Sequence, residues 1–334
     1  MLTDARVLQP EFIPREVKHR DAEVNTLSSV LRPITDGQPA DPVFLYGPSG
    51  VGKTCIAQFT VERLRECVVE LNHQYVNCWE DYSRFKTLYQ LLDGIDHTID
   101  IHRQSTPKDV LLDRLREYTG PPYVVILDEV DQLEDKSLLY DLYRIPNLTM
   151  VLIANREVEL FAHLDDRLTS RLAASTRIQF HPYSNSEITS ILTDRVQWGL
   201  AGNIISQEQL KLIANHATGD ARVAIGTLRN AARHAQQHHL DEITPHVIRK
   251  VVPEAKTEIQ QKTINQLTHH QQVLHEIITE HDEITPKRLY EEYRVRVENP
   301  KTDRMVRNHL SKLEHYNLIK RNGNTKARVY QSTA

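Results

Sequence analysis

Short, continuous apolar runs alternate with segments of helical periodicity through the first half of the chain. The apolar runs lie at residues 43–46, 74–78, 123–128, 148–155 and 176–180. Runs with so little polar alternation are typical of strands that helices cover on both faces, as in a parallel sheet. The pattern therefore predicts an α/β domain built on a five-stranded parallel sheet.

The pattern becomes purely helical after residue 183. Apolar positions follow helical spacing over 185–199, 206–218, 220–239 and 244–252. Ser184 and Glu187 have the spacing of a capping box, which favours a helix start directly after Ser184. We expect a second, all-helical domain. The polar segment 253–262 that follows could be a linker or the continuation of a helix.

The last part of the chain changes character again. Segments of helical spacing at 264–281, 285–294 and 303–316 precede strand-like residues on either side of Asn322-Gly323. An Asn-Gly pair in this setting predicts a hairpin. Three helices followed by a basic hairpin describe a winged helix-turn-helix, whose third helix would enter the major groove of DNA. The predicted domains therefore span 1–182, 183–255 and 256–334.

Composition limits the class of protein. Of 334 residues, 40% are hydrophobic and 26% are charged, which suits a helix-rich globular protein. The three cysteines form no CxxC pair, and their odd number argues against a disulfide scaffold. No apolar run reaches the length of about 18 residues that a membrane span needs, and the N-terminal residues lack the apolar core of a signal peptide. We therefore expect a cytoplasmic protein.

Charge is distributed unevenly along the chain. The formal net charge is −4, yet residues 300–334 hold eight Lys and Arg against two Asp and Glu. An acidic body with a basic end favours a polyanionic partner such as nucleic acid. Charge alone leaves open the simpler interpretation of a solvated basic face.

Residues 47–54 read GPSGVGKT and match the phosphate-loop pattern G-x-x-x-x-G-K-[ST] between a predicted strand and a predicted helix. Glycines let backbone N–H groups converge on phosphate oxygens, and the helix directs its positive end the same way. Lys53 adds a charge for the β- and γ-phosphates, and Thr54 offers a hydroxyl to Mg²⁺. A glycine-rich turn with a surface lysine is the alternative. The predicted ATP contacts here are Gly47, Pro48, Ser49, Gly50, Val51, Gly52, Lys53, Thr54 and Cys55.

Acidic and amide side chains end the next two predicted strands. Asp128 could hold Mg²⁺ together with Thr54, and Glu129 could orient the attacking water and accept its proton. Asn155 ends a strand that should lie between those of the phosphate loop and of Asp128, so its amide could bind the γ-phosphate or the water. An acidic loop and an ordinary turn Asn are the non-catalytic interpretations.

Three arginines could supply positive charge to a transferring phosphoryl group. Arg167 and Arg171 lie four residues apart on one predicted helix face, and such a guanidinium is often delivered by a neighbouring subunit. Arg222 opens a helix of the second domain. On a triphosphate, it would make the angle between domains depend on the γ-phosphate. Surface arginines without such a role are the alternative.

These motifs together resemble the AAA+ ATPases and, more narrowly, the archaeal origin-recognition (Orc/Cdc-type) replication initiators, over almost the full chain. The segment DDRLTSRL, residues 165–172, resembles the box that carries the family's arginine finger, which leaves Arg171 and Arg167 as candidates. TGDARVAIGTLRNAA, residues 218–232, resembles the segment that implies a γ-phosphate contact for Arg222.

Two further segments carry the resemblance. The residues FIPREVKHRDAEVNTLSSVLRP near the N-terminus resemble the family's entry segment, which lies against the adenine. FHPYSNSEITSILTDR, residues 180–195, resembles the entry into a helical lid and implies that Tyr183 and Arg195 contact the nucleotide. The resemblance implies an AAA+ phosphate-loop domain, a helical lid and a winged helix.

The resemblance also implies partners and an activity. ATP and Mg²⁺ would be the cofactors, and slow hydrolysis would act as a switch. The protein would bind double-stranded origin DNA in the nucleoid, self-associate on it and help to recruit the replicative helicase. A transcription regulator with a structural ATPase domain, and a motor or clamp-loading AAA+ machine, remain the alternatives.

Basic and amide residues of the last segment are the candidates for DNA contact. The third helix could read base edges, whereas the hairpin could contact the backbone or the minor groove. A winged helix that binds protein is the alternative. The predicted DNA contacts are Arg304, Arg307, Asn308, Lys312, Lys320, Arg321, Lys326 and Arg328.

Overall fold

The computed structural model describes residues 2–102, 106–156, 166–202, 204–316, 318–323 and 328–333. The chain divides into two compact units, Met1–Glu254 and Ala255–Ala334. No helix in these described ranges is long and apolar enough to cross a membrane.

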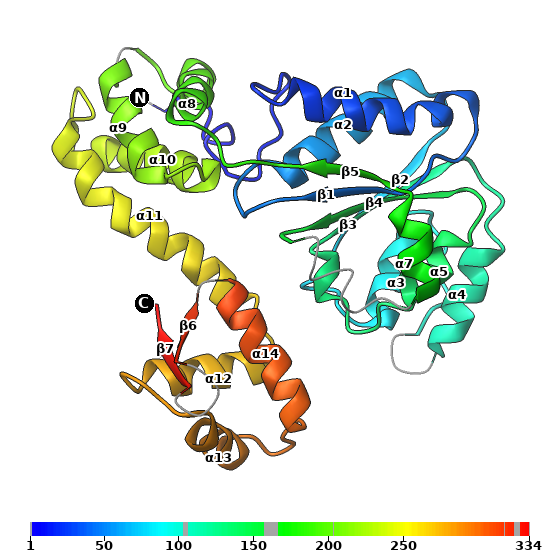
Figure 1. Ribbon diagram of the computed structural model, residues 1–334. Coiled ribbons are helices and arrows are strands. Elements are labelled where there is room, and N and C mark those ends of the chain that lie inside the picture. The colour runs from blue at the N-terminus through cyan, green and yellow to red at the C-terminus, as the bar shows by residue number, and fades with distance from the viewer. Residues whose placement is uncertain are drawn as a thin grey trace. The chain divides into compact units, whose positions relative to one another are not determined.

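A parallel sheet organises the larger unit (Figure 1). Its described strands are β1 (Val43–Tyr46), β2 (Asn72–Asn77), β3 (Tyr123–Asp128), β4 (Leu148–Ala154) and β5 (Thr176–Gln179). They lie in the order β2-β3-β4-β1-β5, and every pairing is parallel. The five-stranded parallel sheet predicted from the sequence is therefore confirmed. The predicted position of β4, between the strands that end at the glycine-rich loop and at Asp128, is also confirmed.

Helices cover both faces of this sheet (Figure 1). One face carries α1 (Asp21–Leu31) and α2 (Lys53–Cys67), and the other carries α3 (Arg84–Asp93), α4 (Lys108–Arg116) and α5 (Leu138–Tyr143). Val43 and Leu45 of β1 join the core beneath α1 and α2, whereas Phe44 joins the opposite core. Alternate side chains of one strand thus enter different cores, which explains why the strands read as continuous apolar runs. Among its described residues, this part of the chain also contains the 3₁₀ helices η1 (Arg32–Asp36) and η2 (Val130–Gln132), and α7 (Asp166–Ala173).

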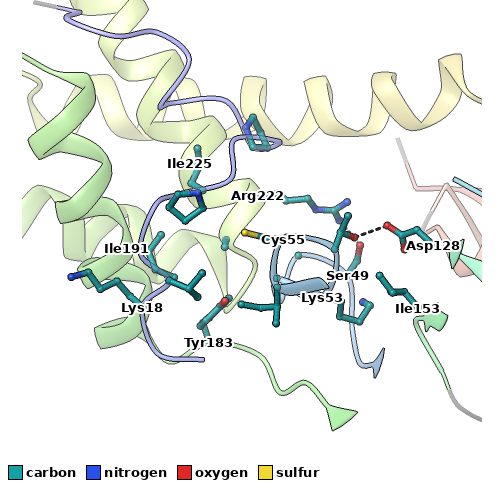
Figure 2. A pocket seen from close by; sticks show the side chains of 18 of the residues that line it. Lys18, Ser49, Lys53, Cys55, Asp128, Ile153, Tyr183, Ile191, Arg222 and Ile225 are labelled. Atoms are coloured by element: carbon teal, nitrogen blue, oxygen red, sulfur yellow. Dashed lines mark hydrogen bonds between the residues drawn. The ribbon is translucent and has the colours of Figure 1, made fainter. Parts of the chain in front are cut away.

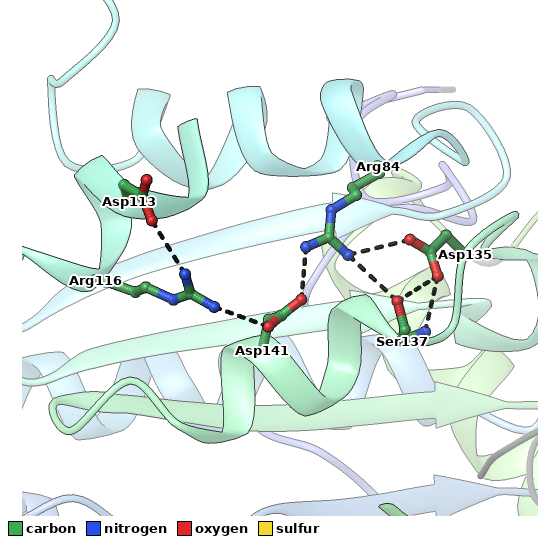
Figure 3. Close-up of polar contacts among 6 residues, drawn as sticks. All are labelled: Arg84, Asp113, Arg116, Asp135, Ser137 and Asp141. Atoms are coloured by element: carbon green, nitrogen blue, oxygen red, sulfur yellow. Dashed lines mark hydrogen bonds and ion pairs between the residues drawn. The ribbon is translucent and has the colours of Figure 1, made fainter. Parts of the chain in front are cut away.

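Two arginines connect the helices of the second face (Figure 3). Arg84 of α3 contacts Asp141 of α5 at 2.5 Å and Asp135 at 3.1 Å. Arg116 of α4 contacts the other oxygen of Asp141, and also Asp113, both at 3.0 Å. A helix as short as α5 is not stable alone. The shared Asp141 carboxylate therefore helps to fix α5 between its neighbours.

The rest of the larger unit is helical. Its described helices are α8 (Asn185–Gly199), α9 (Gln207–Ala217), α10 (Ala221–Gln237) and the first part of α11 (Pro245–Asn265), which continues past Glu254 into the smaller unit. The predicted capping box is present: the Ser184 hydroxyl accepts from the Glu187 N–H, and the Glu187 carboxylate accepts from the Ser184 N–H. Of the two interpretations of 253–262, the helical one is right, because α11 continues through Pro253.

The smaller unit contains α12 (His269–Thr279), α13 (Pro286–Arg296), α14 (Asp303–His315), β6 (Ile319–Asn322) and β7 (Val329–Ser332). The predicted hairpin is confirmed, since β6 and β7 pair antiparallel from Ile319–Ser332 to Asn322–Val329. Its connection comprises residues 323–328, so the Asn-Gly pair does not form a two-residue turn. Ile284, between α12 and α13, adds a bridge to Tyr330 of β7 through two backbone hydrogen bonds of 2.8 and 2.9 Å.

Candidate functional site

The loop between β1 and α2 contains glycines with positive φ angles. Gly50 and Gly52 have φ values of +76° and +93°, which favour glycine. A Cβ on Gly50 would lie 2.0 Å from an Asp220 carboxylate oxygen, and one on Gly52 would lie 2.7 Å from the Tyr183 hydroxyl. Side chains at either position would therefore collide with residues of the helical part of this unit, so the close approach of the loop to Asp220 and Tyr183 requires glycine.

Lys53 begins α2 inside this loop and is only 7% exposed. Its Nζ donates to the carbonyls of Gly47 and Pro48, each at 2.7 Å, and to Asn155 Oδ1 at 2.9 Å. Burial lowers the pKa of Lys53 to about 8, although the nearby Asp128 carboxylate opposes this shift. Three oxygen atoms thus orient the lysine into the loop. An anionic ligand bound there would stabilise the charged form of Lys53 and raise its pKa.

Asp128 lies at the carboxyl end of β3, next to the start of α2, and is 6% exposed. Its Oδ2 accepts from the Thr54 hydroxyl at 2.6 Å, the bond drawn as a dashed line at Asp128 in Figure 2. The same oxygen accepts from the Tyr75 hydroxyl at 3.0 Å. Its Oδ1 accepts from the N–H of Glu129, whose φ of 52° marks a sharp turn out of the strand. This set of oxygen donors is suited to a hard divalent cation and its water shell.

Arg222 reaches the loop from the helical part of the unit. Its guanidinium donates to the Ser49 hydroxyl and lies 3.6 Å from the Asp220 carboxylate. Asp220 caps α10, accepting from the N–H groups of Arg222 and Val223, and the N–H of Ala221 donates to the Gly50 carbonyl at 2.9 Å. The start of α10 is therefore joined to the loop, and Arg222 lies beside it (Figure 2).

A pocket extends from this loop to α8, α10 and the N-terminal residues. Tyr183 forms part of its wall and is 8% exposed, with the Arg20 guanidinium 4.1 Å from its ring. Arg195 also lines the pocket, with its guanidinium bound to the carbonyls of Val7 and Phe12. Of the predicted nucleotide contacts, the pocket is lined by Ser49, Gly50, Gly52, Lys53, Thr54, Cys55, Asp128, Glu129, Asn155, Tyr183, Arg195 and Arg222.

The two predicted finger arginines belong to α7, and of these Arg171 does not line this pocket. The guanidinium of Arg171 lies 5.0 Å from the ring of Tyr140 and 5.3 Å from the ring of Tyr143, both on α5. The side chain of Arg167 lies outside the described residues. The exposed Arg171 is thus held against α5 by cation–π contacts, and a role toward a second molecule stays a hypothesis.

The predicted DNA contacts lie on α14 and the hairpin. Lys326 lies outside the described residues. The side chains of Arg304, Arg307, Asn308, Lys320 and Arg321 are exposed, and those of Lys312 and Arg328 are half-buried. Arg321 forms a 3.5 Å ion pair with Glu314.

Sequence reasoning missed three residues of the site. Arg20 is 6% exposed and donates to the Val51 carbonyl at 3.1 Å and the His181 carbonyl at 2.6 Å. Tyr75 orients Asp128, and burial raises the pKa of its hydroxyl, so it stays a donor. Asp220 caps the helix of Arg222. Only Asp220 had a usable signal, since an Asp before an apolar-periodic segment is a standard N-cap.

Taken together, the sheet order, the glycine-rich loop and the paired Thr54 and Asp128 define a P-loop ATPase domain of the AAA+ class with a helical lid. Comparison with known proteins agrees: residues 16–153 match the family described as AAA ATPase domain, and residues 189–252 match the Cdc6 AAA+ ATPase-type lid domain. The chain belongs to the archaeal Orc/Cdc6 family of AAA+ replication initiators.

Two relatives from Halobacterium salinarum support this assignment. ORC1-type DNA replication protein 1 is 65% identical over 308 residues, which cover 92% of this chain and 100% of that protein. ORC1-type DNA replication protein 9 is 48% identical over 330 residues, covering 99% and 93%.

Solved structures share the fold. The Aeropyrum pernix ORC1 protein in complex with DNA matches with a TM-score of 0.75 and 23% identity, over 99% of this chain and 92% of that chain. The Aeropyrum pernix ORC2 protein, in ADPNP and ADP complexes, matches with a TM-score of 0.68 and 21% identity, over 99% and 94%.

Proposed function

We propose that this protein is an ATP-dependent switch that binds double-stranded origin DNA and helps to recruit the replicative helicase. The proposal divides the chain into an ATPase domain at 1–182, a lid at 183–255 and a DNA-binding domain at 256–334. One observation carries it: Lys53 of the loop and Arg222 of the lid lie on either side of the same phosphate cradle. A ligand with a γ-phosphate would contact both, so its loss would free the lid.

The residues present fit ATP and Mg²⁺. The N–H groups of the loop, Lys53 and Arg222 would hold the phosphates, and Thr54 with Asp128 would hold the cation through their oxygens. Bound Mg²⁺ would neutralise charge on the phosphate oxygens. Tyr183, Arg195 and Cys55 would lie along the rest of the nucleotide. The A. pernix ORC2 complexes with ADPNP and ADP support nucleotide binding at such a site.

Hydrolysis in this proposal is slow and acts as a switch. Glu129 would hold the attacking water and take its proton, with Asn155 beside the γ-phosphate. Arg171, or Arg167 on the same helix, would reach the nucleotide of a neighbouring copy during self-association on DNA. Two observations support this role: Arg171 is exposed, and its contacts with Tyr140 and Tyr143 orient its guanidinium.

The smaller unit supports a winged helix-turn-helix. The order α12, Ile284 bridge, α13, α14, β6 and β7 is the order of such a fold, with Ile284 as the short first strand. Apolar residues of α14, including Val306 and Leu310, face its core, which leaves the Arg304, Arg307 and Asn308 side chains for DNA. The A. pernix ORC1 complex with DNA supports this partner, and nucleoid association would follow from it.

Variants of α14 and the hairpin should weaken DNA binding in different ways. Asn308→Ala removes a side chain that can read a base edge, so it should reduce discrimination between origin and unrelated duplex about tenfold and leave the salt dependence unchanged. The double variant Lys326→Ala, Arg328→Ala should weaken binding to both duplexes and flatten the slope of log K against log salt by about 0.9 per lost phosphate contact. Titration of labelled duplexes by fluorescence anisotropy at several salt concentrations measures both quantities.

Lys256→Ala is the matched control, since it removes an exposed lysine of α11 and should change neither quantity. An unchanged salt slope in the double variant would count against the hairpin as a DNA contact. Helicase loading on origin DNA in a purified system separates an initiator from a transcription regulator.

A further inference from the structure

The first residues of the chain are built into the lid. Leu8 is fully buried and belongs to the core formed by the lid helices. The N–H of Thr3 donates to the Gly199 carbonyl at 2.9 Å, and Leu2 forms an antiparallel bridge with Leu200. The start of the chain is therefore attached along the end of α8.

Two buried arginines of the lid also bind this segment. Arg195, 6% exposed, donates to the carbonyls of Val7 at 2.8 Å and Phe12 at 3.1 Å, and lies 4.9 Å from the Phe12 ring. Arg229, 5% exposed, donates to the Gln9 side-chain oxygen at 2.9 Å. A buried guanidinium is tolerated only where such acceptors are in place, so these contacts define one position for the segment.

The same segment is attached at its other end to the phosphate loop. Arg20 binds the carbonyl of Val51 in the loop and that of His181 between β5 and the lid. Between these two attachments, Pro10, Pro14 and Val17 line the pocket. Proline fixes its own φ angle, which stiffens the part of the segment that crosses the pocket.

We propose that residues 2–18, the N-terminal strap, close over the bound nucleotide and set the rate at which it leaves. Leu8 of the strap, which packs in the lid core, and Arg229 of the lid, which binds Gln9, are positioning residues in this scheme, because they hold the strap and do not line the pocket. Arg195 acts at the same place through the carbonyls of Val7 and Phe12. To release a nucleoside di- or triphosphate, the strap must lift, which withdraws Leu8 from the lid core and breaks the contacts of both arginines. The inference rests on the proposed nucleotide binding in this pocket.

Dissociation kinetics of a fluorescent ATP analogue test the strap. Leu8→Ala and Ile213→Ala remove comparable side chains, both fully buried in the lid core, but only Leu8 belongs to the strap. Stopped-flow chase with unlabelled ATP should show dissociation at least about tenfold faster for Leu8→Ala and within about twofold of the unmodified protein for Ile213→Ala. Gln9→Ala, which loses the Arg229 contact with little change to the core, should give an intermediate acceleration.

Hydrogen exchange separates control of nucleotide release from a purely structural role, because a purely structural role would not make exchange in the strap depend on bound nucleotide. Amides of residues 2–9 should exchange more slowly when the ATP analogue is bound, and Leu8→Ala should remove this difference. Equal dissociation rates for Leu8→Ala and Ile213→Ala would contradict the proposed role of the strap. If Leu8→Ala does not fold, an unchanged dissociation rate in Gln9→Ala would contradict it instead. Failure of the unmodified protein to bind the analogue would instead overturn the proposed function.

Discussion

Lys53→Ala is expected to lower the affinity for ATP by about 100-fold or more. Hydrogen bonds to charged groups contribute about 1.5–3 kcal/mol each, and Lys53 is placed to make two of them, to the β- and γ-phosphates. In the free protein its three N–H groups already donate to the Gly47 and Pro48 carbonyls and to Asn155 Oδ1, so phosphate oxygens must replace some of these bonds, and the expected loss is set at the lower end of the sum of two contacts. Isothermal titration calorimetry with ATP and Mg²⁺ measures the loss.

The same lysine predicts a pH dependence of ATP binding. In the free protein its pKa is lowered to about 8 by burial. A bound triphosphate stabilises the charged form and raises this pKa, so above pH 8 the protein must take up a proton to bind. Affinity should therefore be constant below pH 7 and fall as pH rises beyond 8, by up to about tenfold per pH unit. Lys53→Ala should lose this dependence.

Lys108→Ala is the matched control, because Lys108 is exposed on α4 and does not line the pocket. It should bind ATP as the unmodified protein does. The account would be contradicted if Lys53→Ala bound ATP within about threefold of this control and kept its melting temperature. The loop would then not form part of the nucleotide site.

Glu129→Gln is expected to keep ATP binding and to lose hydrolysis by about 10²–10⁴-fold. The substitution preserves size and hydrogen bonding but removes the basic oxygen that would accept the proton of the attacking water. Asp128, which is placed to hold the cation, stays intact, so affinity should remain within about twofold. Single-turnover hydrolysis of radiolabelled ATP and calorimetric binding measure the two effects separately.

Glu134→Gln serves as the control for this change, since Glu134 is exposed and does not line the pocket. Equal losses of binding in the Glu129 and Lys53 variants would contradict the assignment of separate roles to these residues.

The sheet and its loop could be predicted from the sequence because the residue pattern of each segment agrees with its place in the fold. The runs of β1 and β3 are predicted at the bounds that the structure has, since strands buried on both faces need apolar residues throughout. The start of α8 at Asn185 follows from its capping box. By contrast, the length of α11 was ambiguous, because a polar helix and a polar linker have the same composition.

Parts of the site could not be predicted because they depend on contacts between distant segments. Arg20 meets His181, 161 positions away, and Arg195 meets Val7, 188 positions away. The spacing of residues along the sequence does not indicate which distant carbonyl will accept a hydrogen bond from a buried guanidinium. Tyr75 looked like an ordinary strand residue, and its contact with Asp128 follows from the pairing of β2 with β3. The same reasoning explains why only residues 12–18 of the N-terminal strap were predicted to lie near the base, and why the attachment of residues 2–9 to the lid was not predicted.

The ratio of ATP to ADP affinity in Arg222→Ala tests the central claim most directly, namely that the lid detects the γ-phosphate through Arg222. Arg233→Ala, an exposed arginine of the same helix, is the control. Removing Arg222 should weaken ATP by about 10- to 100-fold and leave ADP within about twofold, because a contact to the γ-phosphate exists only with ATP. An equal loss for both nucleotides, or no loss for either, would contradict the account.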